Sequence, residues 1–488
     1  MRFSRTRSFS LTLVLLIMLT LIAACGGSTT TSDSGNAAST AAPSDAASDV
    51  ASAAPSTAAS PAASGSPAAS AAPLPVSNAE CKLDPAPSEA TTVAYLGNKF
   101  PVVEYFANQL KSCEGGNLTV NLDWLPANER DQKANLVLSS GDTSYEIVQA
   151  TNRNIYEWGA KGWIMPLNDM IAKYKEQYNL GDIPQPVFEA VTFDGKVFGI
   201  PFNQNGQIFF YRKDIYDKYN LKPPATWEEA MTQFKMLAEK KDTPYVYAAT
   251  YAKGSDLAGE FARTFQSAGG TWFNEDATPA FNTPEAVASV NLIKDLLQYA
   301  PPDVLTYNND KVMVALQQGQ VAAAITYISR TARMDDPSQS NVVGKIEYAP
   351  VPAFKQGGPS GTSVGGDSYV IPTATDVDPD LIFRIIMEAT TAERQKPAAN
   401  LSMMTRQSIA NDPEVLKMNR YLPAVTEAIA GDRPALPPYP KVPYYNLAVG
   451  ALGNVLAQAM TGDITAEEAL TQAAEEYETQ AIDKGFIK

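Results

Sequence analysis

The sequence predicts an α/β fold, and the first part of the folded chain carries the observations that predict it. Thr91–Leu96 is a short apolar run typical of a strand, and Pro101–Cys113 places Val, Phe and Leu at helical spacing. Leu118–Trp124 alternates apolar with polar residues, Ala127–Ser139 favours a helix, and Glu146–Ala150 favours a strand. Strand and helix alternating at this spacing imply parallel pairing, and the loops at the carboxyl ends of such strands form ligand crevices.

The rest of the chain continues the mixture of helices and strands. Two strands, Val197–Phe202 and Ile208–Tyr211, are expected on either side of a polar stretch. Thr226 and Thr465 are each followed three residues later by glutamate, which is the spacing of a capping box at a helix start. Further helices are expected at Leu257–Ala268, Pro284–Tyr299, Lys311–Gln318, Leu381–Ala389, Tyr445–Met460 and Thr465–Gln480, and strands at Val321–Tyr327, Ile346–Pro350 and Ser368–Ile371.

Composition narrows the classes of function. The 488 residues carry a formal net charge of −15, which disfavours nucleic acid and anionic headgroups as partners. The absence of histidine removes Ser-His-Asp and Cys-His catalysis and most zinc and haem sites. Three scattered cysteines cannot build a four-thiolate metal site. We expect no catalytic residue, no metal site and no cofactor.

The N-terminus is predicted to be a lipoprotein signal peptide over residues 1–24. Three arginines precede the apolar run Leu11–Ala24, which is too short to span a bilayer comfortably. The run ends in Ile22-Ala23-Ala24-Cys25-Gly26, which resembles the bacterial lipobox. The resemblance implies that Cys25 is lipidated and anchors the protein to the outer side of the cell membrane. The alternative is an ordinary signal anchor that contains a cysteine.

Residues 25–79 are predicted to form a disordered, lipid-anchored linker. They are rich in Ala, Ser, Thr, Pro and Gly, show no periodicity and carry almost no large apolar side chain. As a random coil, such a linker reaches roughly 40 Å. Lipidation of Cys25 leaves Cys81 and Cys113 in an oxidising compartment, where we expect a disulfide between them. Two free thiols are the alternative.

A series of short motifs follows the linker. They lie at Asp194–Phe202, Phe210–Asp214, Pro224–Glu229, Ala268–Phe273, Phe281–Ala286, Gln318–Ala322, Gly365–Pro372 and Gly462–Leu470. In this order they resemble the extracellular solute-binding proteins of carbohydrate ABC importers, the group that includes maltose-binding protein. Arg212 stands where that family usually has Asn, and Glu146 where it prefers Asp. Ala268–Phe273 and the proline-rich stretch Pro437–Pro443 are most similar to the sugar-alcohol binders.

The resemblance implies a periplasmic-binding-protein-like (type II) α/β fold, in which two lobes enclose a hinged cleft. Crossings between the lobes are expected near Ile200–Asn205, Ala353–Gly366 and Met404–Asn411. Closure of the cleft around a ligand would then be read by the membrane permease. The expected boundaries are 80–202 and 353–408 for the first lobe, and 203–352 and 409–488 for the second.

The family likeness also implies a sugar or sugar alcohol as ligand, an ABC permease as partner, and a monomeric protein. Hydroxyl groups both donate and accept hydrogen bonds, and the C–H faces of sugars pack on aromatic rings. Each candidate has a structural alternative: core packing for Trp272, a backbone hydrogen bond for Asn203, and a surface ion pair for Arg406. The candidate ligand-binding residues are Asn98, Lys99, Asn152, Asn203, Asn205, Gln207, Trp272, Tyr327, Arg330, Asp367 and Arg406.

Two tyrosines, two glutamates and the composition of the chain also permit other interpretations. Tyr444-Tyr445 resembles the paired tyrosines of ferric-iron binders, but we interpret it as a helix start with one buried ring. Glu228-Glu229 lies in the first turn of a predicted helix, where acids interact favourably with the helix dipole. An anionic solute would require an arginine cluster or a helix N-terminus in the cleft, and the sequence shows neither. Three competing hypotheses are another small solute, a surface-anchored glycoside hydrolase, and a sensory or adhesive lipoprotein.

Overall fold

The computed structural model describes residues 74–430 and 439–488. The predicted signal peptide, Cys25 and most of the predicted linker lie outside the described residues, as does the start of the proline-rich stretch, Pro437-Pro438. Within the two described ranges, no helix combines the length and the apolar character that crossing a bilayer requires.

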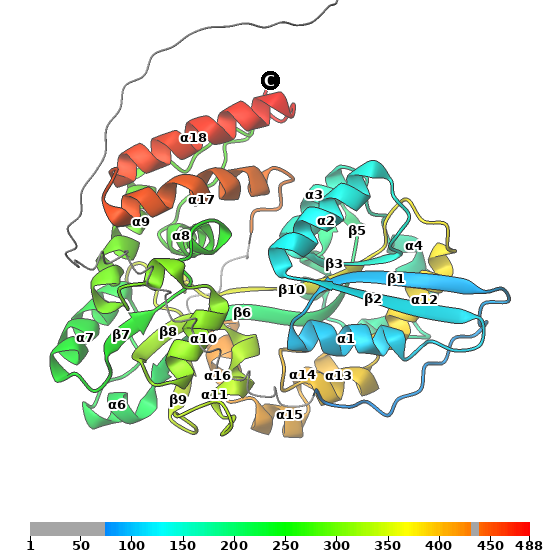
Figure 1. Cartoon of the computed structure of the whole chain (residues 1–488), viewed down its shortest axis with the longest axis horizontal. Coiled ribbons are helices and arrows are strands. Elements are labelled where there is room, and N and C mark those ends of the chain that lie inside the picture. Colours follow the sequence, from blue (N-terminus) through cyan, green and yellow to red (C-terminus); the bar gives the residue numbers. More distant parts are fainter. Residues whose placement is uncertain (1–73, 431–438) are drawn as a thin grey trace, which may run out of the picture. The chain divides into compact units, whose positions relative to one another are not determined.

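One mixed sheet runs through the described chain (Figure 1). Its strand order is β2-β1-β3-β10-β6-β8-β7, and β9 pairs with β6 beside this path. The pairs β1/β2, β1/β3 and β7/β8 are parallel, which confirms the prediction for the first three strands, whereas β10 is antiparallel to β3 and β6. The strands are β1 (Thr91–Asn98), β2 (Leu118–Leu125), β3 (Ile147–Thr151), β6 (Ile200–Arg212), β7 (Tyr245–Ala248), β8 (Val321–Tyr327), β9 (Ile346–Ala349) and β10 (Ser363–Val370), with the separate hairpin β4 (Thr192–Phe193) and β5 (Lys196–Val197).

The structure corrects the prediction of two strands flanking a polar stretch. Val197–Phe202 and Ile208–Tyr211 belong largely to one continuous strand, β6, whose polar middle pairs with Ser363–Asp367 of β10. Polar residues are tolerated there because the two strands satisfy each other's backbone groups between the lobes. Contact is so close at Gly366 that a Cβ would lie 2.2 Å from the Asn203 carbonyl oxygen. Glycine is therefore required at this position.

The first lobe packs helices on both faces of β1, β2 and β3. One hydrophobic core lies under α1 and α12, and a second lies under α2 and α3. Figure 1 shows α2 and α3 on one side of these strands and α1 on the other. The helices are α1 (Pro101–Lys111), α2 (Ala127–Ser140), α3 (Asn152–Ala160), α4 (Asn168–Tyr174), η1 (Leu180–Asp182), α5 (Gln185–Glu189), α12 (Pro379–Ala389), α13 (Ala392–Ala398), α14 (Gln407–Ala410) and α15 (Pro413–Met418).

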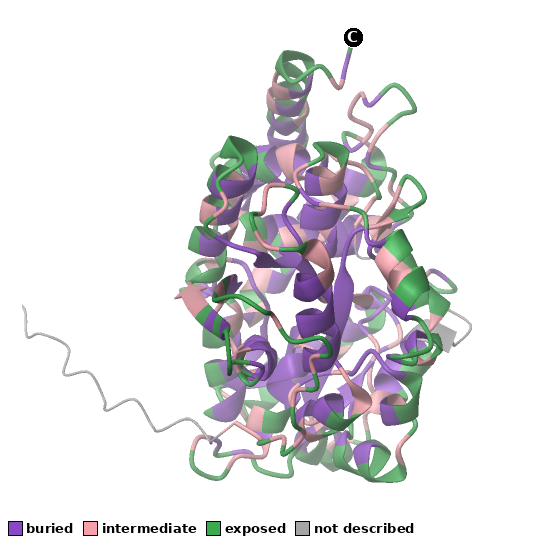
Figure 2. Cartoon of the chain, turned by 90° about the vertical axis from the view of Figure 1, so that its right-hand side faces the viewer, coloured by how far each residue is buried: buried purple, intermediate pink, exposed green. Residues whose placement is uncertain are grey.

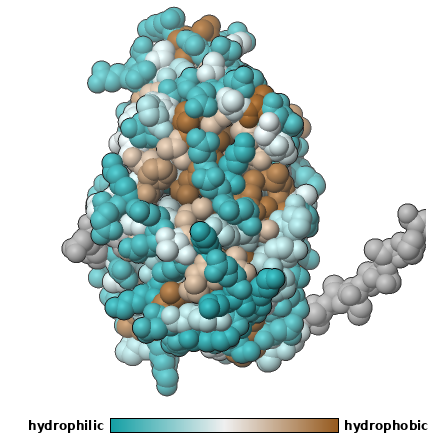
Figure 3. Space-filling model, turned by 90° about the vertical axis from the view of Figure 1, so that its left-hand side faces the viewer, coloured by the Kyte–Doolittle hydropathy of each residue, from teal (hydrophilic) through white to brown (hydrophobic). Residues whose placement is uncertain are grey.

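The second lobe has one large core, around β7, β8 and the C-terminal helices. Seen from the side of the first lobe, buried residues gather on the central strands, whereas the outer helix faces are exposed (Figure 2). The outer face of this lobe is mostly hydrophilic, with hydrophobic residues gathered near its middle (Figure 3). The helices are α6 (Lys213–Lys218), α7 (Trp227–Lys240), α8 (Ser255–Ser267), α9 (Pro284–Leu296), η2 (Leu297–Tyr299), η3 (Val304–Thr306), α10 (Asn309–Gln317), η4 (Ile328–Arg330), α11 (Thr331–Met334), α16 (Leu422–Ala430), α17 (Tyr445–Thr461) and α18 (Ala466–Asp483).

The chain passes three times between the two sets of cores. It leaves the first lobe along β6, returns along β10, and leaves again between Val415 and Tyr421, which belong to cores of different lobes. The last passage lies beyond the expected Met404–Asn411, because Ile409 and Val415 of the short helices α14 and α15 still pack in the first lobe. Helices of four to six residues are too short to show a helical period in the sequence.

Both predicted capping sites begin helices, but only one is a full capping box. At α18, Thr465 Oγ1 accepts from the Glu468 N–H (3.1 Å), and the Glu468 carboxylate accepts from the Thr465 N–H (2.8 Å). At α7, Thr226 Oγ1 accepts from the Glu229 N–H (3.2 Å), but the Glu229 carboxylate accepts from Ala225 instead. The threonine cap stabilises both helix ends in the same way.

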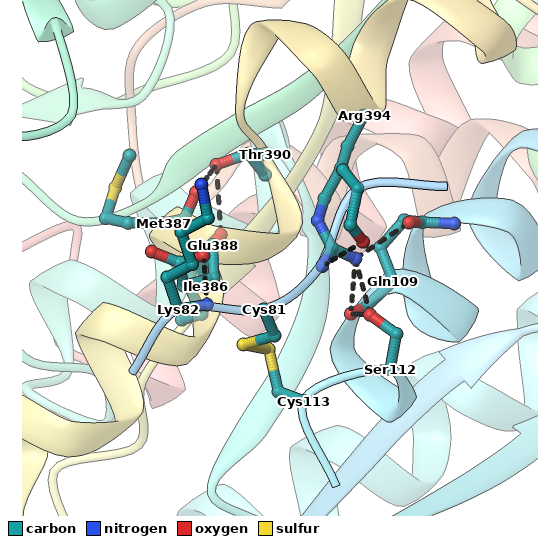
Figure 4. Close-up of a disulfide and its surroundings, with 11 residues drawn as sticks. Cys81, Lys82, Gln109, Ser112, Cys113, Ile386, Met387, Glu388, Thr390 and Arg394 are labelled. Atoms are coloured by element: carbon teal, nitrogen blue, oxygen red, sulfur yellow. Dashed lines mark hydrogen bonds between the residues drawn. A yellow bond between two sulfur atoms is a disulfide. The ribbon is translucent and has the colours of Figure 1, made fainter. Parts of the chain in front are cut away.

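A disulfide joins Cys81 to Cys113, the pairing predicted from the sequence, with the two Cα atoms 5.0 Å apart (Figure 4). It fastens the segment before β1 to the end of α1. The same segment is held by hydrogen bonds from its Lys82 N–H to the Glu388 carboxylate (2.9 Å) and from Arg394 to the Ala79 carbonyl (3.0 Å). The start of the described chain is thus tied to the first lobe alone.

Replacing both cysteines with serine should lower the free energy of unfolding by about 3–4 kcal/mol. The bridge closes a loop with a sequence separation of 32, and chain entropy alone predicts this size. Urea denaturation of the Cys81→Ser/Cys113→Ser variant and the parent measures it. A reducing agent should destabilise the parent equally and leave the variant unchanged. Equal stability of oxidised parent and variant would contradict the prediction.

Candidate functional site

A cavity of about 280 Å³ lies where the paired strands β6 and β10 pass between the lobes, and residues of both lobes line it. Its volume is at the lower limit of the roughly 300–1,000 Å³ that small-molecule sites usually have. Among the eleven candidates from the sequence, the structure brings seven to this cavity: Asn98, Asn152, Asn205, Gln207, Tyr327, Arg330 and Asp367.

The wall from the first lobe is built around the Asp367 carboxylate on β10. Its two oxygens accept hydrogen bonds from Gln149 Nε2 (2.9 Å) and Asn203 Nδ2 (3.1 Å). Gln149 also accepts from the Asn98 N–H (2.8 Å), so the end of β1, the middle of β3 and β10 are joined. Burial raises the pKa of Asp367, while the Gln149 and Asn203 amides oppose that rise. The network fixes the carboxylate at the cavity edge.

Asn152 holds the β10 backbone in place at the start of α3. Its side-chain oxygen accepts from the Gly366 N–H (3.0 Å), and its amide donates to the Ala190 carbonyl (2.6 Å). Asn154 caps the same helix, because its side-chain oxygen accepts from the Thr151 N–H (3.1 Å) and Oγ1 (2.6 Å). Asn152 thus contributes to the cavity mainly by positioning its wall.

The wall from the second lobe depends on Glu260, which is fully buried on α8. Its carboxylate accepts from Gln207 Nε2 (3.1 Å), from Thr250 Oγ1 (2.7 Å) and from Arg263 Nη2. Arg263 is 4% exposed and lines the cavity. A buried guanidinium needs such a partner, because an isolated charge is strongly disfavoured in the interior.

Arg330 reaches across the cavity toward the first lobe. Its guanidinium lies 4.2 Å from the centre of the Phe100 ring, a cation–π contact between lobes. Arg330 Nη1 donates to Ser329 Oγ (3.0 Å), and Nη2 lies 3.7 Å from the exposed Asp310 carboxylate. Ser329 in turn accepts from Asn205 Nδ2 (3.1 Å) on β6. Arg330 is therefore held by the crossing strand and by both lobes.

Three arginines from different elements meet at the cavity, which the sequence did not reveal. Within the described part of the chain, Arg130 Nε, Arg263 Nε and Nη1, and Arg330 Nε are buried and have no hydrogen-bond partner. These N–H groups can only donate, so a ligand that supplies oxygen acceptors would satisfy them. Each guanidinium also has a carboxylate within 4 Å, from Asp131, Glu260 and Asp310 respectively.

The structure places the other four candidates away from the cavity lining. Lys99 is exposed, and Asn203 lies behind Asp367 as its hydrogen-bond partner. Trp272 packs in the core of the second lobe, with its ring 5.0 Å from that of Tyr445. Arg406 is buried and donates to the carbonyls of Thr390, Asn179 and Tyr178. Trp272 and Arg406 therefore stabilise the fold, and no ligand contact is proposed for them.

Sequence reasoning missed several residues of the cavity wall. Gln149 was recognisable as a polar residue inside an apolar strand. Arg130, Asp256 and Arg263 lie on helices whose polar positions look like solvent-facing ones, so no local pattern marks them. Tyr439 follows the undescribed residues 431–438 and also lines the cavity.

The segment from Tyr439 to Asn446 contacts the first lobe directly. Lys441 Nζ donates to the Glu189 carbonyl (2.9 Å), and Asn446 Nδ2 donates to the Glu157 carboxylate (2.5 Å). Tyr445 is buried in the second-lobe core beside Trp272. Helix α17 begins at Tyr445, which confirms the interpretation of Tyr444-Tyr445 as a helix start with one buried ring.

The comparison with protein families agrees with this geometry. The family model described as bacterial extracellular solute-binding protein matches residues 97–393, more than half of the chain. The chain belongs to this family. The members of the family are binding proteins that act outside the cytoplasm.

Curated relatives of this solute-binding protein include two that are named as binding proteins. A probable amino-acid ABC transporter periplasmic-binding protein of Sinorhizobium fredii is 25% identical over 76% of this chain and 83% of its own. The mannitol-binding protein of Pseudomonas aeruginosa is 22% identical over 68% of this chain and 79% of its own.

Solved structures show the same fold. An ABC transporter solute-binding protein from Agrobacterium radiobacter K84, in complex with ribitol, superimposes with a TM-score of 0.72. It is 22% identical, and the match covers 81% of this chain and all of the other. The fold is thus the two-lobed one of maltose-binding-protein-like solute-binding proteins, as the sequence predicted.

Replacing Glu260 with glutamine should lower the free energy of unfolding by about 3 kcal/mol. The change leaves the buried Arg263 guanidinium without its carboxylate, and breaking a buried ion pair on one side typically costs about 3–5 kcal/mol. Denaturant unfolding measures the loss. Glu478→Gln, the same change at an exposed position on α18, is the matched control and should have almost no effect. Equal stability of the two variants would contradict the role assigned to Glu260.

Proposed function

We propose that this chain is the lipid-anchored, extracytoplasmic substrate-binding subunit of an ABC importer that captures a small sugar or sugar alcohol. The observation that carries the proposal is the cavity between the lobes, lined from both sides by partly unsatisfied polar side chains. Ligand contacts to both lobes favour the closed arrangement, because only there are all of them made together. The permease would then recognise the closed protein and receive the ligand. No chemical step is required of the chain.

The charges of the cavity favour a neutral ligand. The three arginines supply N–H donors, and each already has a carboxylate nearby. A ligand with a net negative charge would add to these carboxylates, whereas hydroxyl groups can accept from arginine and donate to Asp367. The arginine cluster that we expected only for an anionic solute therefore fits a neutral, hydroxyl-rich one.

The size and the aromatic content of the cavity favour a monomeric ligand. The described cavity is lined by the rings of Phe100, Tyr327 and Tyr439, and none of the five tryptophans reaches it. The Arg330 guanidinium already lies over Phe100. A broad ring platform on which the rings of an oligosaccharide could stack is thus not supplied by these side chains. An acyclic polyol or a single sugar suits a cavity of about 280 Å³. The related proteins named above include a mannitol-binding protein and a solute-binding protein in complex with ribitol.

A thermal-shift screen followed by calorimetry tests this proposal. We expect ribitol, D-mannitol or another single sugar or alditol to raise the melting temperature. Ligand at 100 times its dissociation constant stabilises the native state by about 2.7 kcal/mol. Maltose should give a smaller shift. A panel in which amino acids bind and no sugar or polyol does would overturn the ligand class, and turnover of a glycoside would support an enzyme instead.

Arg330→Ala should weaken binding of the best alditol by about 10- to 100-fold, because it removes a charged hydrogen-bond donor worth roughly 1.5–3 kcal/mol. Arg420→Ala removes a partly exposed arginine that pairs with Asp335 and Glu347 away from this cavity, and serves as control. Calorimetric titration of both variants measures the difference. Unchanged affinity in Arg330→Ala would exclude this arginine from the site.

The anchor is tested separately. Cys25→Ala should release the protein from membranes into the soluble fraction, since the lipobox interpretation makes Cys25 the lipid attachment point. Detergent phase partitioning of cell fractions measures it. Cys113→Ser, which changes another cysteine, should remain membrane-bound. Equal partitioning of the parent and Cys25→Ala would contradict lipidation at this position.

A further inference from the structure

Asp256 is a carboxylate at the cavity wall that the fold itself does not use. It lies in the first turn of α8 and lines the cavity, half-buried. Among the described residues its oxygens take part in no hydrogen bond, and no cation lies within ion-pair distance of them. Glu260, one turn further along the same helix, accepts three hydrogen bonds. Glu260 therefore has a structural role, whereas Asp256 remains available to a ligand.

The charged groups around Asp256 come from four elements. Glu260 on α8 and Asp310 on α10 disfavour its ionised form, whereas Arg153 on α3 and Arg330 on η4 favour it. Burial, and then the negative charge of Glu260, raise the pKa of Asp256 to about 6. The chain contains no histidine. Histidine is the side chain that usually titrates near neutral pH. In its absence, Asp256 titrates in that pH range.

We propose that ionised Asp256 accepts hydrogen bonds from two neighbouring hydroxyls of the bound polyol, and that its protonation weakens capture as the surroundings become acidic. This inference rests on the proposed function. It adds the residue that selects the ligand and makes the binding affinity depend on pH. A carboxylate offers two oxygens and no proton, so it complements the arginines, which only donate. Vicinal hydroxyls are the ligand group that can donate to both of its oxygens. A ligand that lacks adjacent hydroxyls loses one of these bonds.

The direction of the pH effect follows from linkage. Hydroxyl donors stabilise the ionised form, so binding lowers the pKa of Asp256 below its value in the free protein. Affinity is therefore full above pH 7 and is lost as the pH falls through about 6. If the bound carboxyl returns to the ordinary value of about 4, the affinity at pH 5 is about tenfold lower than at pH 7.5.

Calorimetry with ribitol and D-mannitol at pH 5.0, 6.0 and 7.5 tests the proposal on the full chain. Buffers of different ionisation enthalpy count the protons released. We expect about a tenfold loss of affinity between pH 7.5 and pH 5.0, with close to one proton released per polyol at pH 5.0 and almost none at pH 7.5. Asp256→Asn should bind about tenfold more weakly at pH 7.5, with no pH dependence. Asp295→Asn, the same change on the exposed face of α9, should behave as the parent.

The outcomes separate this inference from the proposed function. Binding that is equally strong at pH 5.0 and 7.5 without proton release overturns the role of Asp256, even if Asp256→Asn fails to fold. A folded Asp256→Asn that keeps both affinity and pH dependence overturns it as well. If neither ribitol, D-mannitol nor any other alditol or monosaccharide binds the parent at pH 7.5, the proposed function itself fails.

Discussion

The antiparallel pairing of β6 with β10 is the constraint on which the rest of the structure depends. Both strands run from one lobe to the other, so their polar middle sections lie between the hydrophobic cores. Backbone pairing there satisfies groups that would otherwise be buried without partners. The same sections place Asn205, Gln207 and Asp367 at the cavity. One pair of strands thus connects the lobes and supplies part of the wall between them.

Two kinds of polar side chain surround the paired section of β6 and β10, and their roles differ. Asp367 and Glu260 are occupied by amide, hydroxyl and guanidinium donors from the protein itself, which makes each wall rigid. Arg130 Nε, Arg263 Nε and Nη1, and Arg330 Nε are buried and find no hydrogen-bond partner among the described residues. A ligand whose oxygens accept hydrogen bonds from these donors would remove the cost of leaving them unsatisfied. A binding site needs walls whose side chains are held in place by their own hydrogen bonds, as Asp367 and Glu260 are here.

Much of this arrangement was predictable from local sequence. The first three strands and the helix caps at Thr226 and Thr465 follow from short-range patterns. The Cys81–Cys113 bridge follows from the count of cysteines left in an oxidising compartment. The cavity was predictable only where the family resemblance pointed to strand ends. Arg130 and Arg263 could not be found, because their burial depends on tertiary contacts of helices that look amphipathic. Trp272 was wrongly expected at the cavity, because a tryptophan shortly after two glycines suits a loop and a hydrophobic core equally well.

The Cys81–Cys113 bridge and the contacts of Lys82 and Ala79 attach the start of the described chain to the first lobe only. A membrane anchor upstream would therefore hold the first lobe and leave the second lobe free to move relative to it. Force on the anchored segment would be borne by α1 and α12, and not by β6 and β10, which connect the lobes. Force on such an anchor would therefore not pull the two lobes apart.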